Sequence, residues 1–224
     1  MIKVNSYNKM SQVFILRHGE RADRAPTRRN YPVSFDPCFT ELGLHQAEKS
    51  SEQILELIEP GKSVHIVSSP FLRCLETAGK LAEKLNTNVH MEEGFGEFLL
   101  TCDFSECPFD SLTYKRLGKG QLETSIGVTL TENQHVVRPK FPENFQSVKH
   151  RVEKAWSTYL SKVQEDVLVI VTHLFILESL TELLLGKHFS VTEEGYCRLT
   201  YAEFDGTNFE IKLCGDFSHV PQRL

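Results

Sequence analysis

The sequence predicts an α/β fold, a three-layer α/β/α sandwich with a mainly parallel central sheet. Short apolar runs rich in β-branched residues alternate with longer segments whose apolar residues repeat at helical spacing. The resulting order, largely β-α-β-α-β-α-β-α, is typical of a parallel sheet covered by helices on both faces. The 224 residues, 40% of them hydrophobic, can bury the core of one domain. We therefore predict a single domain over residues 1–224, with a variable insertion at about 99–142.

The first two strand-helix units lie in the N-terminal part of the chain. The apolar run 13–16 ends abruptly at Arg17, as a buried strand does where it reaches the edge of a sheet, and an arginine-rich loop follows. The apolar spacing then predicts an amphipathic helix over 40–58. The second unit is a strand at 64–67 followed by a helix over 70–85, whose start is marked by the Ser-Ser-Pro triplet.

A third, shorter strand is expected at 89–91, and the next predicted helix begins only at residue 145. From about residue 94 to residue 142 the pattern predicts a long irregular stretch, and loops of this length are usually functional or mobile. Regular spacing returns at 145–163, which predicts a helix of about five turns. We expect the irregular stretch to be the variable part of the domain.

The most apolar run of the chain is expected to be a central strand. Residues 167–171 are five consecutive apolar residues, mostly β-branched, as a parallel strand buried on both faces requires. A helix over 175–185 follows and stops at a glycine. Segments 196–204 and 209–213 flank an Asp-Gly pair, which predicts an antiparallel hairpin at the C-terminal end.

The overall charge limits the partners that the chain can take. A net charge of -5 and a pI near 6.0 argue against binding to nucleic acid or to an anionic membrane. The polar residues 1–11 lack the apolar stretch of a secretory signal, and no run is long enough to span a bilayer. A cytoplasmic location is the expectation, with a homodimer as an open possibility.

Metal binding and disulfide bonding are not expected. The six cysteines are scattered, which is typical of reduced thiols and not of a disulfide framework. Cys102 and Cys107 are close in sequence, but no second pair of Cys or His completes a tetrahedral site. The sequence therefore predicts a protein without a metal or another cofactor.

Reactive side chains follow the predicted strands, where open α/β sheets bind their ligands. These positions hold two histidines, three arginines and one glutamate: Arg17, His18, Arg21, Arg73, Glu97 and His173. A neutral imidazole can attack phosphorus, guanidinium groups can hold the phosphate oxygens through paired hydrogen bonds, and a carboxylic acid can protonate the departing oxygen. The set therefore points to phosphoryl transfer by protein side chains alone.

The same residues resemble the histidine phosphatase superfamily, also known as the phosphoglycerate-mutase-like fold. The resemblance covers 13–98 and 145–186 in order, and it rests on three segments: Arg17-His18-Gly19-Glu20, Ser68-Ser69-Pro70-Phe71-Leu72-Arg73 and His173 at a strand end. Asp36-Pro37 and Phe39-Thr40-Glu41-Leu42-Gly43 are similar to the family's segment before the first long helix. Arg21 makes the first motif similar to the branch that contains the Sts and ecdysteroid-phosphate phosphatases.

The resemblance implies a role for each residue. His18 is the nucleophile that becomes phosphohistidine, and Arg17 and Arg73 bind phosphate. His173 is a second, protonated histidine that also binds substrate, and Glu97 is the acid that later activates water. Arg21 is a further substrate-binding residue. The expected substrate is a small phosphomonoester or a phosphotyrosine-like group.

Two departures from the family pattern leave alternatives open. His173 is followed by Leu174, where the family usually has glycine, and the insertion at 99–142 does not align with a segment of the family. A phosphoglycerate-mutase type of phosphotransferase is one alternative, and a catalytically weak phosphate-binding or scaffolding module is the other. The aromatic residues Phe109, Tyr114 and Phe141 of the insertion either line a pocket for the leaving group or pack the insertion onto its own domain.

Overall fold

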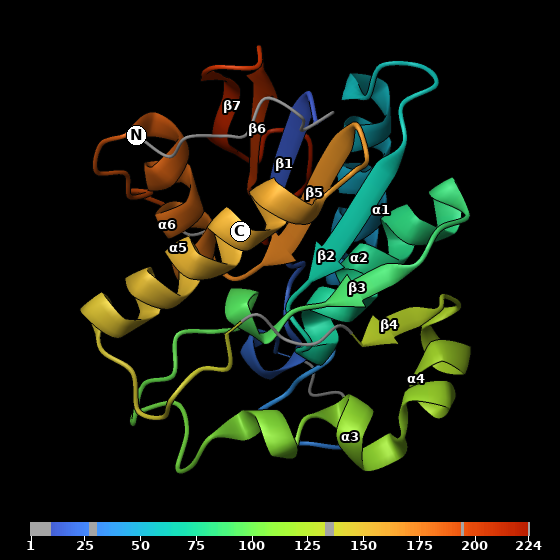
Figure 1. Ribbon diagram of the computed structural model, residues 1–224. Coiled ribbons are helices and arrows are strands. Elements are labelled where there is room, and N and C mark those ends of the chain that lie inside the picture. The colour runs from blue at the N-terminus through green and yellow to red at the C-terminus, as the bar shows by residue number, and fades with distance from the viewer. Residues whose placement is uncertain (1–9, 27–30, 133–136, 194, 224) are drawn as a thin grey trace.

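The computed structural model describes residues 10–26, 31–132, 137–193 and 195–223. Its centre is a seven-stranded sheet in the order β4-β3-β2-β5-β1-β6-β7 (Figure 1). The strands are β1 (Gln12–Arg17), β2 (Val64–Ser68), β3 (Val89–Met91), β4 (Leu130–Glu132), β5 (Val167–Thr172), β6 (Leu199–Phe204) and β7 (Phe209–Asp216). The helices are α1 (Glu41–Leu57), α2 (Leu72–Leu85), α3 (Thr113–Leu117), α4 (Lys119–Ile126), α5 (Phe145–Lys162) and α6 (Leu174–Leu185).

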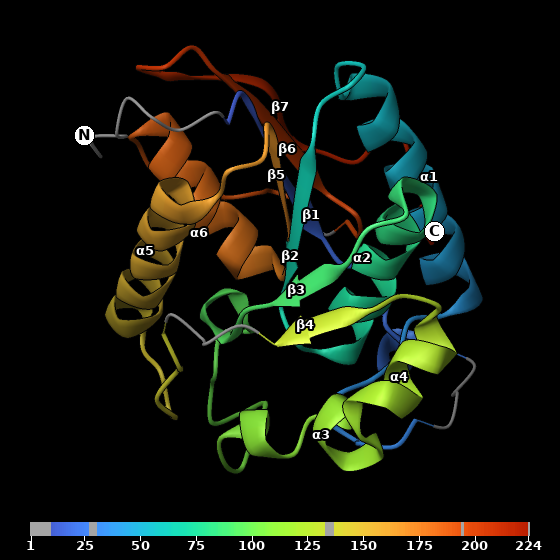
Figure 2. The same cartoon turned by 45° about the vertical axis from the view of Figure 1, so that its right-hand side comes forward.

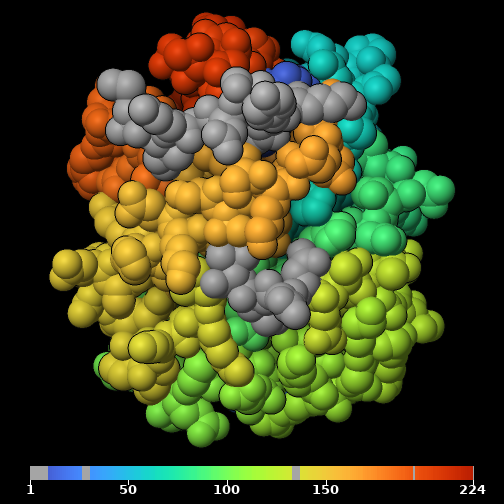
Figure 3. Space-filling model, in the orientation of Figure 1, coloured from blue at the N-terminus to red at the C-terminus, as the bar shows by residue number. Residues whose placement is uncertain are grey.

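The helices form one layer on each side of the sheet, which confirms the predicted three-layer sandwich. Helices α1 and α2 cover one face, and α5 and α6 cover the other (Figure 2). In β1, Phe14 and Leu16 belong to the core on the α1 and α2 side, whereas Val13 and Ile15 belong to the core on the α5 and α6 side. Figure 3 shows α5, in yellow and orange, across the face seen in Figure 1.

The parallel strands end level with one another, and this alignment creates the site. Strand β5 pairs in parallel with both β1 and β2, and β3 extends the parallel part to β4. In these ladders Arg17 is level with Thr172, and Ser68 is level with Val171. The residues that follow the three strands therefore meet at the same edge. The expected C-terminal hairpin is also confirmed, because β6 and β7 are antiparallel.

The expectation of a long irregular stretch from residue 94 to residue 142 is wrong. This segment contains α3, α4 and β4, and β4 joins the sheet in parallel with β3. Its elements have at most eight residues, too few for a periodic apolar pattern to stand out in the sequence. Phe109 and Tyr114 are buried in the core on the α1 and α2 side, so they hold the segment to its own domain.

Across the described part of the chain, no helix combines the length and the apolar composition that crossing a bilayer requires.

Two glycines allow the loop after β1 to contact the first turn of α1. A Cβ atom on Gly19 would lie 2.6 Å from the carbonyl oxygen of Gly43, and a Cβ atom on Gly43 would lie 2.4 Å from the carbonyl oxygen of Glu20. Both distances are to backbone atoms, which cannot rotate away as the end of a side chain can. The glycine after His18 is therefore explained by this contact.

Gly43→Ala is expected to destabilise the protein by at least about 2 kcal/mol, because overpacking against fixed backbone must move one of the two segments. The measurement is the free energy of unfolding in urea. Gly120→Ala is the matched control, since no atom lies within 4 Å of the added Cβ in α4. That change is expected to be neutral or stabilising by up to about 1 kcal/mol. Equal losses in the two variants would contradict the prediction.

Candidate active site

His18 lies at the centre of the edge where the parallel strands end. Its backbone N–H donates to the carbonyl of Thr172 at 3.0 Å, and its own carbonyl accepts from the N–H of Cys197 at 3.2 Å. The backbone of His18 is thus held between the end of β5 and the segment that leads into β6. The side chain is buried, and its ring lies 5.4 Å from the ring of His173.

The hydrogen bonds of His18 determine which ring nitrogen is available. Nδ1 lies 2.8 Å from the carbonyl oxygen of Gly19, which can only accept, so Nδ1 carries the hydrogen. Nε2 therefore has a lone pair, and it accepts from Nε of Arg73 at 3.2 Å. Burial and the charge of Arg73 lower the pKa of His18 well below its ordinary value. His18 is accordingly a neutral imidazole with a nucleophilic Nε2.

Arg73 is the cation at the base of the site. It is the second residue of α2, and the start of this helix is held by Asp36, whose Oδ1 accepts from the N–H of Leu72 at 2.8 Å. The side chain of Arg73 is only 1% exposed. Its Nε contacts His18, and its Nη2 donates to Oε2 of Glu97 at 3.0 Å. Within the described residues, Nη1 is buried without a hydrogen-bond partner, which is costly unless an anion binds there.

Glu97 and His173 form a second contact at the same place. Nδ1 of His173 lies 3.1 Å from Oε2 of Glu97, and Nε2 of His173 lies 2.8 Å from the hydroxyl of Ser69. Burial would raise the pKa of Glu97, but His173 and Arg73 outweigh it and hold that pKa well below the ordinary value. Glu97 is therefore a carboxylate when no substrate is bound.

The charge state of His173 depends on its surroundings. Burial, opposed by Glu97 and reinforced by Arg73, lowers the pKa of His173 to about 4. Burial therefore favours the neutral ring in the site without phosphate, and a protonated His173 stays a prediction for the site with phosphate bound. The reason is the surrounding protein: His173 is completely buried and lies 3.1 Å from the guanidinium of Arg73.

Arg17 reaches the site from the end of β1. Its Nη1 donates to the carbonyl of Gly195 at 2.8 Å, and its guanidinium lies 4.6 Å from the ring centroid of Tyr196. The ring of Tyr196 in turn lies 5.8 Å from that of His18. The charge of Arg17 contributes to the lowered pKa of His18. No sequence pattern indicated Tyr196, whereas Ser69 was part of the Ser-Ser-Pro motif without an assigned role.

Arg151 holds the turn that carries Glu97. It lies on α5, is 3% exposed, and donates from Nη1 to the carbonyls of Gly94 and Gly96 and from Nη2 to the carbonyl of Glu97, at 2.9 to 3.0 Å. Glu143 accepts from its Nε and Nη2, each at 2.7 Å. These bonds explain how a loop residue keeps a defined position. The sequence signalled nothing here, because a charged residue on an amphipathic helix usually faces solvent.

A cavity of about 780 Å³ opens beside Arg73 and Glu97. Arg21 lies on its wall, where Nε and Nη2 form a paired contact with Asp23 at 2.6 and 2.7 Å. Leu174 begins α6 and also lines the cavity. The size falls in the usual range for small-molecule sites, about 300–1,000 Å³. The structure therefore gathers all six residues predicted for the site: Arg17, Arg73 and Glu97 lie around the rings of His18 and His173, and Arg21 lies at the cavity wall.

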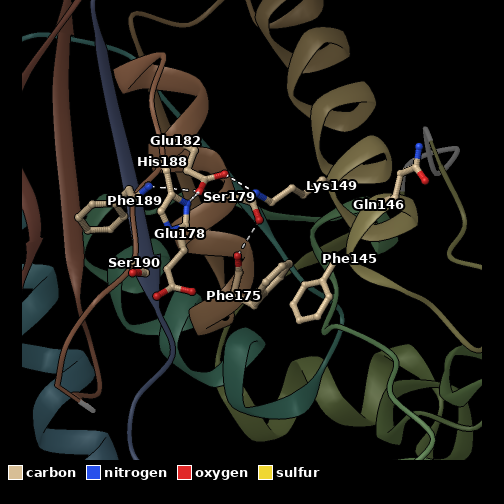
Figure 4. Close-up of a pocket in the computed structure, with 10 residues that line it drawn as sticks. All are labelled: Phe145, Gln146, Lys149, Phe175, Glu178, Ser179, Glu182, His188, Phe189 and Ser190. Atoms are coloured by element: carbon tan, nitrogen blue, oxygen red, sulfur yellow. Dashed lines mark hydrogen bonds and ion pairs between the residues drawn. The ribbon is translucent and has the colours of Figure 1, made fainter.

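A second recess of about 440 Å³ lies between α5 and α6 (Figure 4). It shares Phe175 and Glu178 with the cavity beside Arg73. Lys149 and Glu182 form an ion pair of 2.6 Å within it.

In the described residues, no group of three or more His, Cys, Asp or Glu side chains is placed to hold a metal ion. The absence of a cofactor stays a prediction.

Comparison with known proteins identifies relatives of this chain. A family model described as "Histidine phosphatase superfamily (branch 1)" matches residues 13–216. The "Transcription factor tau 55 kDa subunit" of Saccharomyces cerevisiae is 27% identical over 177 residues, which are 73% of this chain. The chain spans 38% of the length of that curated relative.

Solved structures show the same fold. YhfR of Bacillus stearothermophilus superposes with a TM-score of 0.63 at 21% identity, covering 94% of this chain and 99% of that one. The ecdysone phosphate phosphatase of Bombix mori, solved in complex with tungstate, gives a TM-score of 0.62 at 17% identity. It covers 95% of this chain and 94% of its own.

Proposed function

We propose that this chain, which belongs to the histidine phosphatase superfamily (branch 1), is a phosphomonoesterase that works without a metal through phosphorylation of His18. One observation carries the proposal. A buried arginine, Arg73, donates to the nucleophilic nitrogen of a neutral histidine, and one further guanidinium nitrogen has no partner among the residues that the structure describes. A phosphate oxygen would supply that partner, and the attacking atom would already lie beside the phosphorus.

The proposed reaction has two steps. In the first, the lone pair of His18 Nε2 forms a bond to phosphorus, the bond from phosphorus to the ester oxygen breaks, and Glu97 gives a proton to that oxygen. In the second, Glu97 takes a proton from water while the water oxygen attacks phosphorus. The bond to Nε2 then breaks, and inorganic phosphate leaves. Arg17 and Arg73 stabilise the charge on the phosphate oxygens throughout.

Substrate binding would change the charge state of Glu97. In the free site Arg73 is an ion-pair partner of Glu97. A phosphate dianion would engage this guanidinium and would also place negative charge beside the carboxylate. Both changes raise the pKa of a carboxyl group. The same dianion would raise the pKa of His173, so Glu97 and His173 would gain their protons when the substrate is present.

Hydrolysis is favoured over the two alternatives. A phosphoglycerate mutase must hold the carboxylate of its substrate, yet Phe98 and Leu100 line the cavity after Glu97. These apolar side chains offer no donor to a carboxylate. A scaffolding module without catalysis would not need the neutral His18 and the buried Arg73 side by side, because burying such groups costs stability.

The proposed function is tested with purified protein and p-nitrophenyl phosphate. Hydrolysis is expected to survive an excess of EDTA, because the reacting groups are all side chains. Vanadate is expected to inhibit it, because vanadate can adopt the five-coordinate geometry of the transition state. Activity that EDTA removes and added metal restores would overturn the metal-independent mechanism.

Glu97→Gln is expected to affect the first step according to the leaving group. A general acid typically contributes about 10²–10⁴-fold, and an alkoxide needs the proton far more than p-nitrophenolate does. Single-turnover phosphorylation should therefore slow at least about 10²-fold with glycerol phosphate and much less with p-nitrophenyl phosphate. Equal slowing with both esters would mean that Glu97 is structural, and the acid would then be sought among Asp103, Glu106 and Asp110.

The pH profile gives a related prediction. The lowered pKa of His18 keeps its lone pair free in mild acid, whereas protonated Glu97 becomes more abundant as the pH falls. The kcat/KM for glycerol phosphate is therefore expected to rise from pH 8 to about pH 5, where acid and nucleophile coexist. Glu97→Gln should remove most of this rise. A wild-type rate that falls steadily below pH 7 would contradict the low pKa of His18.

A further inference from the structure

The cavity beside Arg73 is lined by charged side chains and by a set of apolar side chains, here called the apolar layer. Six of its lining side chains are apolar: Phe35, Phe98, Leu100, Phe104, Leu174 and Phe175. They come from three segments far apart in sequence, which are the loop after β1, the stretch 98–104 after β3 and the first turn of α6. A charged phosphate group does not bind to apolar side chains. We therefore expect these side chains to contact the organic group that is esterified to the phosphate.

The aromatic rings of this layer are held in place by contacts with one another. Phe35 and Phe104 lie 6.2 Å apart between ring centroids at 71°, and Phe98 and Phe175 lie 4.9 Å apart at 33°. These separations are typical of packed aromatic pairs. Because each ring is supported by a neighbour, the layer is formed before a ligand arrives, which reduces the ordering cost of binding.

Phe145 supports the second pair from the outside. It is 67% exposed, and its ring centroid lies 5.3 Å from that of Phe98 and 5.6 Å from that of Phe175. Figure 4 shows Phe145 and Phe175 next to each other where α5 faces α6. Phe175 therefore separates the two recesses, with one side toward Phe145 and the other toward the cavity.

Leu174 extends the apolar layer up to the catalytic histidine. It follows His173 directly and is half-buried at the start of α6, where a glycine would leave the wall without a side chain. Leucine at this position adds an apolar side chain to the cavity wall directly after His173. A polar leaving group would lose its hydrogen bonds to water there without replacing them.

We infer that this cavity selects phosphomonoesters whose leaving group carries an aromatic or similarly bulky apolar ring, with Leu174 as a specificity-determining residue. The inference rests on the proposed function, because it assumes that phosphate binds at Arg73. The ring packs against the apolar layer, and small polar esters such as glycerol phosphate gain nothing from it. The preference comes from apolar surface removed from water.

The test measures the equilibrium dissociation constants of two phosphonates, which keep the phosphate-like group but cannot be hydrolysed. Wild-type protein is expected to bind 1-naphthylmethylphosphonate about 30-fold or more tightly than methylphosphonate, the scale expected for burial of an aromatic ring. Leu174→Ala should reduce this ratio about fivefold and leave methylphosphonate binding unchanged. The retained methylphosphonate binding also reports that the variant is folded.

Leu184→Ala is the matched control. Leu184 is half-buried on the same helix and packs against the core without lining the cavity, so this variant should keep the wild-type ratio. Wild-type ratios within threefold of unity would overturn the inference and leave the proposed function standing. A high ratio that Leu174→Ala does not change would overturn the role of Leu174. Failure to bind either phosphonate would overturn both the inference and the phosphate site on which it rests.

Discussion

His18→Ala should reduce the turnover of p-nitrophenyl phosphate by at least about 10⁴-fold, the scale seen when a covalent nucleophile is removed. The physical reason is specific to one atom. The contact from Nδ1 to the carbonyl of Gly19 leaves Nε2 with the lone pair, and that atom faces Arg73. Alanine removes the atom that would bond to phosphorus, so the phosphoenzyme cannot form at this residue.

The phosphoenzyme itself is the second readout of this prediction. Rapid quenching of wild-type protein during turnover should trap phosphate in an acid-labile, base-stable form that peptide mapping places on His18. His150→Ala is the matched control, because His150 is exposed on α5, and it should keep the activity and the adduct. An His18→Ala variant with more than a tenth of the wild-type rate would disprove the nucleophile assignment, provided that its thermal midpoint shows a folded protein.

Arg73→Lys should lower kcat/KM by about 10²-fold or more, by analogy with the loss of one oxyanion donor. Each nitrogen of the guanidinium has its own role. Nε contacts His18 and Nη2 contacts Glu97, whereas Nη1 has no partner among the described residues and is expected to bind phosphate. Lysine offers one ammonium group on a flexible stem and cannot occupy three positions. Because the variant keeps the positive charge, its decrease in kcat/KM reports the contribution of the arrangement of the guanidinium nitrogens.

Arg24→Lys is the matched control for Arg73. Arg24 also lines the cavity, but it is exposed to solvent. A change of less than threefold is expected there, because screening by water and salt makes an exposed cation nearly interchangeable. The inhibition constant of inorganic phosphate should rise in Arg73→Lys and stay unchanged in Arg24→Lys. Equal losses of activity in the two variants would contradict this prediction. They would mean that phosphate binding depends on positive charge in the cavity and not on the planar guanidinium of Arg73.

The core of the site was predictable because of how parallel sheets are built. Apolar runs ending at Arg17 and Thr172 indicated strands, and the carboxyl ends of parallel strands meet at one edge. It follows that His18 and His173 must be neighbours, although they are 155 positions apart in the sequence. Arg73 was found in the same way, as a residue at the start of the helix that follows β2.

The insertion and the support of Glu97 were not predictable for a common reason. Helices α3 and α4 and strand β4 are short, so their positions depend on packing against the domain and not on a local pattern. Arg151 holds the Glu97 turn through bonds to residues more than 50 positions away. A single sequence carries no record of such a contact.

Local periodicity and strand order in the sequence are thus sufficient for the sandwich, the edge and the identity of the reactive side chains. The charge states and the shape of the cavity were settled by tertiary contacts. The neutral ring of His173 results from burial and from Arg73, and the apolar layer joins Phe35, Phe104 and Leu174 from three distant segments. Secondary structure follows from neighbours along the chain, whereas a pKa and a binding surface depend on distances through space, which only the folded chain defines.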